Sequence, residues 1–278
     1  MDTLELKIDV QPREPWSGIL IAELSELGFD GFMETRTGIM AYGPATIDLD
    51  QVINDSSLGE PKGFKFQMEK NIIPYQNWNA TWEAEFEPVF VDELATIIAP
   101  FHDENVVKGM KVVIEPQMSF GTGHHQTTWL MSRALLSMKG IPTRVLDMGA
   151  GTGVLAIVCE KLGAEQIIAV DIEEEAVKNI EHNVELNSCN KISAIAGDIN
   201  VLDEEEPFGL ILANINKNVL KNHMKRYSEL TLQNGQLWLS GFFESDVDEL
   251  LEASSLVGFE RISVDNKEGW ALIRLKKN

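Results

Sequence analysis

The sequence predicts an α/β protein, in which a mostly parallel sheet is covered by helices and preceded by a small α+β domain. From about residue 108 onward, apolar strand-like runs alternate with helix-like runs, which is the pattern of a parallel sheet covered on both faces. Before residue 72 the elements are shorter, and two strand-like runs follow each other directly. The change of pattern between these regions predicts two domains.

The domain at residues 1–72 is expected to contain four strands and two helices. Its apolar residues alternate from Leu4 to Val10, as in a half-buried strand. The expected elements are a strand at 4–10, a helix between Pro15 and Gly28, a hairpin around Thr37–Gly38, a helix at 48–55 and a strand at 63–70. This β-α-β-β-α-β order is typical of ferredoxin-like domains. The domain shows no catalytic cluster, which fits a recognition or structural module.

Residues 73–100 are expected to form a linker that contains one helix. Trp78, Trp82 and Phe86 fall four residues apart, on one side of a helix that Pro88 would end. Aromatic side chains at this spacing are typical of packing, so the helix is expected to anchor one domain against the other.

The domain at residues 101–278 is predicted from alternating strands and helices. Strands are expected at 111–116, 144–149, 166–171, 192–198, 210–215 and 236–242, and helices at 127–138, 154–163, 173–187 and 246–256. Two closing strands, at 259–265 and 269–277, are separated by three residues only. They are expected to form an antiparallel hairpin at one edge of the sheet.

Composition favours a protein of a reducing compartment. The formal net charge is -21, from 44 acidic and 23 basic residues, and no basic block interrupts it, which argues against direct nucleic-acid binding. The acidic surface serves solubility or attracts a basic macromolecular partner. Two cysteines cannot build a disulfide framework, and no apolar run approaches the roughly 18 residues of a membrane span. We therefore expect a cytoplasmic protein without membrane contact.

A glycine-rich turn predicts a nucleoside-binding site. Gly149, Gly151 and Gly153 lie between an expected strand and an expected helix, where a tight turn lets a ligand approach the backbone. Asp171 ends the next strand, 22 residues after Gly149, where a carboxylate can accept hydrogen bonds from both hydroxyls of a ribose.

The spacing of the glycines favours S-adenosylmethionine over a dinucleotide. A dinucleotide fingerprint needs a third glycine at the position of Val154, and residues 147–160 contain no Lys or Arg to face a pyrophosphate. Asp147 stands beside the turn instead, where a carboxylate suits a cationic ligand. S-adenosylmethionine carries a sulfonium cation and an amine.

These residues resemble those of a known enzyme class. "DMGAGTG", Asp171, "AGD" ending in Asp198 and the closing hairpin look like a class I S-adenosylmethionine methyltransferase, which has a Rossmann-like fold. More narrowly, "SFGTGHHQTT", "LANI" and "WNATWEAEFEPV" resemble the ribosomal protein L11 methyltransferase family. The resemblance implies methylation of lysine and N-terminal amines of that basic ribosomal protein, with residues 1–72 as the substrate-recognition domain. A monomer is favoured.

The resemblance also implies the site residues. The family's cofactor contacts fall on Thr128, Gly149, Asp171 and Asn214, and Asn214 is also the expected catalytic residue, because donor and acceptor should meet at its strand end. Gly121, Gly151 and Asp198 complete the expected cofactor site, with Asp198 as a partner for the adenine amine. One departure concerns Asn216, where the family commonly has an apolar residue.

The stretch at residues 118–131 holds two adjacent histidines and two adjacent threonines. His124 and His125 cannot both face one metal from a regular helix or strand, and no Cys or carboxylate stands close by, so no metal site is expected. Residues 121–123 are expected to fold over the methionine end of the cofactor. Thr127 and Thr128 either bind its carboxylate or only cap the next helix. Each histidine is either a base or a residue that shapes the site.

Several alternatives stay open from the residues alone. "ANIN" lacks the proline and aromatic residue typical of enzymes that methylate planar nitrogens, which favours a flexible amine substrate. That amine could belong to another protein or a small molecule. A nicotinamide-dependent oxidoreductase and a binding module without enzymatic activity are the alternatives from other classes.

Overall fold

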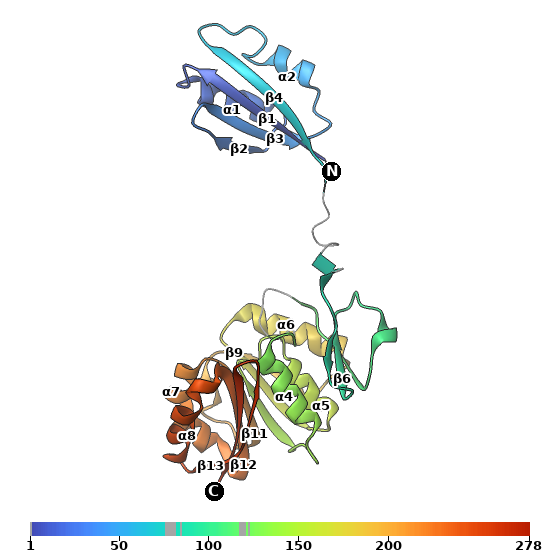
Figure 1. Ribbon diagram of the computed structural model, residues 1–278, viewed down its shortest axis with the longest axis vertical. Helices are drawn as coiled ribbons and strands as arrows, with labels where there is room; N and C mark the ends of the chain where they lie inside the picture. Colours follow the sequence, from blue (N-terminus) through green and yellow to red (C-terminus); the bar gives the residue numbers. More distant parts are fainter. Residues whose placement is uncertain (1, 76–81, 84, 117–120, 122) are drawn as a thin grey trace. The chain divides into compact units, whose positions relative to one another are not determined.

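The computed structural model describes residues 2–75, 82–83, 85–116, 121 and 123–278. The chain divides into two compact units, Met1–Glu85 and Phe86–Asn278, which Figure 1 colours along the sequence. The helix predicted around Trp78 and Trp82 falls mostly on residues outside the described ranges, so it stays a prediction.

Up to residue 75, the described elements of the first unit follow the predicted order: β1 (Thr3–Gln11), α1 (Trp16–Glu26), β2 (Gly31–Glu34), β3 (Gly38–Pro44), α2 (Leu49–Asp55) and β4 (Lys65–Ile73). The strands form one sheet in the order β2-β3-β1-β4, with every neighbouring pair antiparallel. Alternate β1 residues from Leu4 to Val10 pack with Leu20 of α1 and Val52 of α2. Both helices therefore cover the same face of this sheet.

The second unit begins with a small sheet of three strands: β5 (Val89–Val91), β6 (Ala95–Ile98) and β7 (Met110–Val113), with the short helix η1 (Glu104–Val106) before β7. β5 pairs with β6 in antiparallel and β6 with β7 in parallel orientation. β5 and β6 fall within the linker expected at residues 73–100, and β7 was expected to be a strand of the main sheet. The structure differs because all four residues of β6 are buried, and Ala95 and Ile97 belong to a core cluster of the second unit.

The remaining elements build the main layer of the second unit. The helices are α4 (Gln126–Leu136), α5 (Val154–Lys161), α6 (Glu174–Leu186), η2 (Ile199–Leu202), α7 (Lys217–Leu230), η3 (Glu244–Asp246) and α8 (Val247–Ser255). The strands are β8 (Arg144–Met148), β9 (Gln166–Asp171), β10 (Ile192–Ala196), β11 (Phe208–Asn214), β12 (Thr231–Phe243), β13 (Phe259–Lys267) and β14 (Trp270–Lys277). No helix in the described part of the chain is long and apolar enough to cross a membrane.

The seven strands form one sheet in the order β10-β9-β8-β11-β12-β14-β13. The strands from β10 to β12 are parallel, while β14 is antiparallel to β12 and to β13. The closing hairpin is therefore present at one edge, as predicted. Its turn is made by Glu268 and Gly269, whose φ angles of 52° and 83° belong to the left-handed region that two-residue hairpin turns use.

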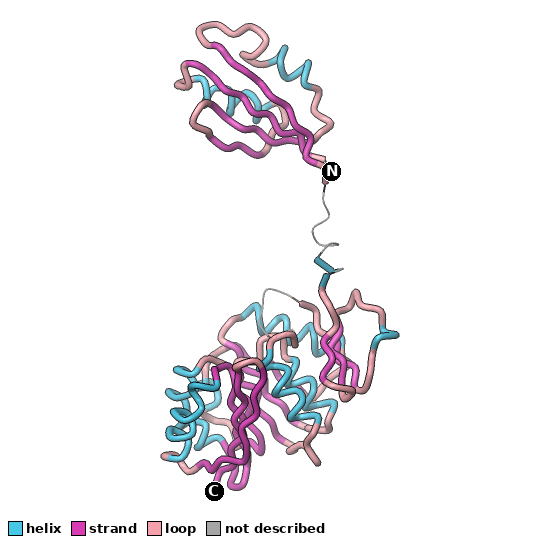
Figure 2. Tube along the Cα trace, viewed as in Figure 1, coloured by secondary structure: helices cyan, strands magenta, loops and turns pink. Residues whose placement is uncertain are grey.

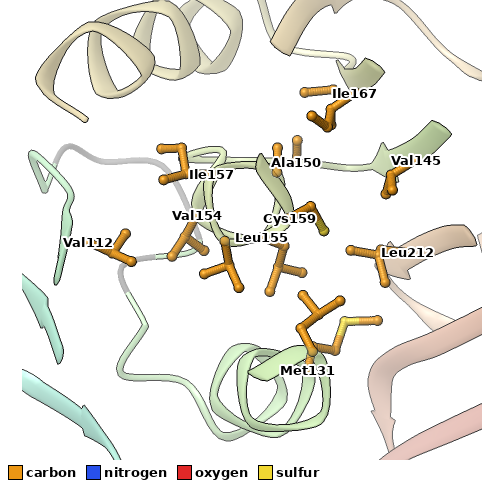
Figure 3. Close-up of a cluster of buried hydrophobic side chains, with 14 of the residues drawn as sticks. Val112, Met131, Val145, Ala150, Val154, Leu155, Ile157, Cys159, Ile167 and Leu212 are labelled. Carbon is orange, nitrogen blue, oxygen red and sulfur yellow. The ribbon is translucent and has the colours of Figure 1, made fainter. Parts of the chain in front are cut away.

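Helices cover both faces of this sheet (Figure 2). On one face, α4 and α5 pack with sheet residues such as Val145 and Leu212, and Figure 3 shows Leu155 and Ile157 of α5 in this cluster together with Met131 of α4. On the other face, α7 and α8 pack with a second set of sheet residues. Because the strands from β10 to β12 are parallel, their carboxyl ends lie at one common edge of the sheet.

Helix α7 was missing from the prediction. Only four of its 14 residues are buried, namely Leu220, Met224, Tyr227 and Leu230. Their spacings of four, three and three residues are those of one helix face. That periodicity is the sequence signal that predicts the helix, although the polar residues between these positions dominate the composition of the segment.

Candidate active site

A cavity of about 1280 Å³ opens at the carboxyl ends of β8, β9 and β11. The strand order reverses at this edge, because the chain passes from β8 outward to β9 and β10, and from β11 to β12 on the other side. Ligands of open α/β sheets bind at such a point. All the residues predicted to bind the cofactor line this cavity: Gly121, Thr128, Gly149, Gly151, Asp171, Asp198 and Asn214.

The turn between β8 and α5 is made by glycines in the left-handed region. The φ angles of Gly149, Gly151 and Gly153 are 73°, 55° and 77°, which residues with a side chain rarely adopt. A Cβ atom on Gly149 would lie 2.2 Å from Cγ2 of Ile215. The N–H group of Gly149 donates to the carbonyl of Val170 at 2.8 Å. The turn therefore presents backbone to the cavity and is tied to the end of β9.

Asp147 lies beneath this turn and is not one of the residues that line the cavity. Its side chain is 1% exposed, and Oδ2 accepts a hydrogen bond from the N–H of Ala156 in the first turn of α5, at 3.2 Å. Burial raises the pKa of Asp147 to about 7. The interpretation that Asp147 faces a cationic ligand is wrong, because the alternation along β8 directs it, like Val145, to the face that α5 covers.

Asp171 ends β9 and is half-buried at the cavity wall. Its Oδ2 accepts a hydrogen bond from the N–H of Gly151 at 2.8 Å, and Oδ1 accepts one from the N–H of Glu173 at 3.2 Å. Each carboxylate oxygen has a second lone pair. The carboxylate is thus held in place by the backbone and can still accept hydrogen bonds from a ligand.

Thr128 and Asn214 meet at the cavity from elements that are far apart in the sequence. Nδ2 of Asn214, at the end of β11, donates to Oγ1 of Thr128 at 3.4 Å. Thr128 is 2% exposed, whereas Asn214 is half-buried. The bond fixes the Asn214 amide while leaving other hydrogen-bonding positions of the amide for a ligand.

The two histidines next to Thr127 contact different partners. Nδ1 of His125 lies 2.8 Å from Oγ1 of Thr127 and accepts the N–H of the same threonine at 3.4 Å, so His125 caps α4. Nε2 of His124 lies 2.8 Å from the carbonyl oxygen of Glu87. The threonines therefore do not cap the helix, and both of them line the cavity. Within the described ranges, no group of three His, Cys, Asp or Glu side chains could hold a metal ion.

Gly121 reaches the cavity through a contact with the glycine turn. Its carbonyl accepts a hydrogen bond from Oγ1 of Thr152 at 2.7 Å, and a Cβ atom on Gly121 would lie 2.9 Å from that same oxygen. The carbonyl of Thr152 accepts in turn from Nδ2 of Asn183, a buried residue of α6, at 2.9 Å. Thr122 lies outside the described residues, so the predicted fold of residues 121–123 over a ligand stays a prediction.

Asp198 lines the cavity beyond the end of β10 and is exposed. Its Oδ1 accepts from the N–H of Asn200 at 2.9 Å, and Oδ2 accepts from the side-chain amide of the same residue at 3.0 Å. Asp198 therefore caps η2. This role is compatible with a ligand contact, since both oxygens keep a further lone pair.

Several residues that line the cavity were not predicted from the sequence, among them Trp270, His223 and Gly241. The ring of Trp270 lies 4.5 Å from that of His125 and 4.2 Å from that of Phe243, measured between centroids. Gly241 has a φ of 93°, and a Cβ atom there would lie 2.4 Å from the carbonyl oxygen of Ile215. A glycine inside a buried strand signals such a close approach of two backbone segments.

Asn216, the departure from the family pattern, has a structural role. It precedes α7, and its side-chain oxygen accepts a hydrogen bond from the N–H of Val219 at 3.2 Å. Asn is one of the strongest residues at this capping position. The presence of Asn at position 216 is therefore accounted for by the start of the helix.

The charged side chains that line the cavity in its described part are all acidic. Its described lining contains neither Lys nor Arg, while four carboxylates line it: Asp171, Glu173, Glu175 and Asp198. An aqueous cavity bordered by carboxylates favours cations and disfavours phosphates. The arrangement suits a ligand that carries hydroxyl groups and positive charge.

Comparisons with known proteins identify the family of this chain. The family model described as "Ribosomal protein L11 methyltransferase (PrmA)" matches residues 23–278. The ribosomal protein L11 methyltransferase of Porphyromonas gingivalis is 38% identical over 258 residues, which cover 92% of this chain and 89% of the relative. The protein of the same name from Bacteroides thetaiotaomicron is 34% identical over 269 residues, 94% of each chain.

A solved structure shows the same fold. The ribosomal protein L11 methylase from Lactobacillus delbrueckii subsp. bulgaricus superimposes with a TM-score of 0.64 at 24% identity, covering 69% of this chain and 100% of that chain. The family model spans nearly the whole chain, and two relatives above 30% identity cover more than nine-tenths of it. This chain therefore belongs to the ribosomal protein L11 methyltransferase family.

Proposed function

We propose that this protein transfers methyl groups from S-adenosylmethionine to lysine side-chain and N-terminal amines of ribosomal protein L11. One observation carries the proposal: the glycine turn, Asp171 and Asn214, which are distant in sequence, line a single cavity at the strand ends of a chain of this family. The relatives are named for the methylation of that ribosomal protein.

The residues at the cavity fit S-adenosylmethionine. When bound, this cofactor supplies a methyl group on a sulfonium cation, which leaves readily. The four carboxylates of the lining and the absence of Lys and Arg from its described part suit a cation. Gly149 lines the cavity with backbone alone, and a side chain is excluded there because a Cβ would meet Ile215 at 2.2 Å.

Each cofactor-binding residue has a proposed role. Asp171, already held by two backbone N–H groups, accepts hydrogen bonds from the ribose hydroxyls. Asp198 accepts from the amine of the nucleobase, and Thr128, at the amino end of α4, donates to the carboxylate of the methionine part. Gly121, Gly149 and Gly151 contribute backbone surfaces.

Asn214 is the proposed catalytic residue, because it lies at the strand end where donor and acceptor meet. Methyl transfer needs mainly alignment of the two reacting atoms. A lysine amine has a reference pKa of about 10.4 and must lose its proton before it attacks. The apolar surfaces of Trp270 and Ile215 exclude water from this end of the cavity, and desolvation favours the neutral amine.

The N-terminal unit is the proposed recognition domain for the ribosomal protein. Residues 1–70 contain 13 acidic and 6 basic residues, which complements a basic partner. A chain beginning at Phe86 tests this assignment, because residues 89–98 pair with β7 and must be kept. It is expected to bind the cofactor like the full chain and to methylate L11 with a much higher KM. An unchanged KM would remove the recognition role.

Calorimetry and methyl transfer test the function itself. The protein is expected to bind S-adenosylmethionine and its product S-adenosylhomocysteine, and not NAD, because Val154 occupies the place of a third glycine and no described cation faces a pyrophosphate. Radiolabelled methyl donor with purified L11, followed by mass spectrometry, identifies the modified amines. Binding of NAD alone, or no label on L11 in the presence of bound donor, would contradict the proposal.

A further inference from the structure

His223 is a polar side chain at the cavity for which neither the sequence nor the family resemblance indicated a role. It lies in α7, lines the cavity and is half-buried. Its Nδ1 atom is buried and has no hydrogen-bond partner among the described residues. A buried nitrogen without a partner is destabilising relative to one that is hydrogen-bonded. Nδ1 is buried in this orientation, so a ligand in the cavity would satisfy it once the imidazole rotates toward the cavity.

The position of His223 in α7 tells which end of the cavity it faces. Val219 and Arg226, four residues before and three after, lie on the same side of the helix. Val219 also lines the cavity, and Nη2 of Arg226 donates to the carbonyl of Leu202 and to Oδ1 of Asp203, both at 3.0 Å. This side of α7 therefore lies along η2.

Helix η2 marks the nucleobase end of the cavity. Asp198 caps its first turn and is the proposed partner of the adenine amine. The acceptor end is marked by other elements, since Asn214 contacts Thr128 of α4 and Trp270 contacts His125. The contacts of α7 consequently connect His223 to the end of the cavity at Asp198.

We infer that His223 binds an edge of the adenine ring and, together with Asp198, sets the preference of the site for adenine. The inference rests on the proposed function, because it takes S-adenosylmethionine as the ligand. Adenine presents a donor, its N6 amine, next to the acceptor N7 on one edge. A neutral imidazole carries one donor and one acceptor nitrogen. A carboxylate accepts only, so the pair Asp198 and His223 offers both kinds of partner.

Binding of S-adenosylhomocysteine to the full-length protein tests this inference without any turnover. His223→Leu keeps an apolar body of similar bulk and is expected to weaken binding about tenfold, the loss of one well-formed hydrogen bond. His223→Gln, which retains a donor and an acceptor, is expected to recover part of the affinity. The matched control is Tyr227→Phe, which alters the neighbouring ring 6.0 Å away without touching the cavity lining.

Base preference provides the second measurement. S-inosylhomocysteine carries a carbonyl oxygen in place of the N6 amine, and 7-deaza-S-adenosylhomocysteine lacks the acceptor N7. The wild-type protein is expected to bind S-adenosylhomocysteine more tightly than either analogue. For at least one analogue, the ratio of its dissociation constant to that of S-adenosylhomocysteine is expected to be smaller in His223→Leu than in wild type. Tyr227→Phe should leave both ratios unchanged.

The outcomes separate the inference from the proposed function. If the wild-type protein does not bind S-adenosylhomocysteine, the proposed function fails. If it binds, and His223→Leu retains both the affinity and the base preference, the inference is overturned. A variant with normal affinity but a raised KM for L11 would place His223 at the acceptor instead, and a variant with only a lower melting temperature would assign it to packing. Both results contradict the inference.

Discussion

The two ends of the cavity are lined by different kinds of side chain. At the ends of β9 and β10, the carboxylates of Asp171 and Asp198 already accept hydrogen bonds from neighbouring backbone N–H groups. At the ends of β11 and β12, the lining contains the amide of Asn214 and the aromatic ring of Trp270, which lies opposite Phe243. One end thus offers charged acceptors that are fixed beforehand, whereas the other offers an oriented amide and an apolar wall.

The difference between these two sets of side chains indicates that the two ends of the cavity have different functions. Fixed carboxylates lose little freedom when a ligand with hydroxyl and amine groups binds, so we expect this end to supply affinity and selectivity for the cofactor. An amide beside an apolar wall contributes less charge, but it can align a neutral amine and keep water away. We therefore expect substitutions at the first end to change cofactor binding, and substitutions at the second end to change turnover or substrate binding.

The largest effect is expected at the acceptor end, from Asn214→Ala. Misalignment near the reacting atoms costs on the order of a hundredfold in rate, so single-turnover methylation at saturating cofactor should slow by about that factor. The affinity for S-adenosylhomocysteine should change less. Rapid-quench kinetics and calorimetry on the same sample measure both quantities.

Asn216→Ala is the matched control for this variant. Asn216 lies two residues further on, also lines the cavity and caps α7. Because its side-chain oxygen accepts from Val219, its loss should lower the free energy of unfolding by about 1 kcal/mol and slow the single-turnover rate much less than Asn214→Ala does. If Asn214→Ala behaves in the same way as this control, Asn214 only stabilises the strand end and has no catalytic role.

The next effect is expected at the charged end, from Asp171→Ala. Hydrogen bonds to a charged group contribute about 1.5–3 kcal/mol, which corresponds to a dissociation constant for S-adenosylhomocysteine that is roughly 10- to 100-fold higher. Since Asp171 also accepts from Gly151 and Glu173, part of the loss will come from a looser turn. Asp171→Asn keeps an acceptor and should lose less. Equal affinity of Asp171→Ala and wild type would exclude the ribose contact.

A third prediction concerns Asp147, which lies beneath the charged end without lining it. Its pKa is raised from 3.8 to about 7, mainly by burial, so between these values the folded protein keeps a proton that the unfolded chain has released. The free energy of unfolding therefore falls as pH rises through this window and levels off above pH 7. Between pH 5.5 and 7 the change amounts to about 2 kcal/mol.

Asp147→Asn cannot titrate and tests this prediction. Thermal melts from pH 5.5 to 8.5 stay above the sequence pI of about 4.6. The melting temperature of the variant relative to wild type should rise with pH, and its affinity for S-adenosylhomocysteine should stay close to normal. A constant difference between the two melting curves would mean that Asp147 is ionised across the whole range.

The residues around the glycine turn show which features can be predicted from a single sequence. The relation of Gly149 to Asp171 follows from one strand-turn-helix-strand unit, so local spacing was sufficient. Asp147 belongs to the same unit, but its direction depends on the alternation within β8, which the motif alone does not reveal. The strand β6 was missed because its partner β7 lies 12 or more residues away and the intervening segment shows no regular pattern.

Residues at the acceptor end were harder to predict for the same reason. Asn214 and Thr128 were proposed from the family resemblance, and their contact spans 86 residues of sequence. Trp270 reaches the cavity only because β14 pairs with β12, which sets it opposite Phe243. Such pairings depend on the packing of the whole sheet, so local periodicity carries no information about them.

The smallest effect on substrate binding or turnover is expected from Trp270→Leu. This variant tests whether the apolar end of the cavity acts on the substrate and not on the cofactor. The ring lines the cavity and packs on His125 and Phe243, so its apolar surface can pack on the methylene chain of an arriving lysine, and the smaller Leu loses about 1 kcal/mol of this contact. The KM for L11 should rise about fivefold, while the affinity for S-adenosylhomocysteine should stay within about twofold of wild type.

Trp129→Leu provides the matched control, because Trp129 is not one of the residues lining this cavity, although its ring contacts Lys267 and Arg133. This control loses a hydrogen bond to the carbonyl of Phe90 and should therefore be somewhat less stable, with an unchanged KM. If Trp270→Leu weakens S-adenosylhomocysteine binding as strongly as Asp171→Ala does, the aromatic wall belongs to the cofactor site. The division of the cavity into a charged cofactor end and an apolar acceptor end would then have to be abandoned.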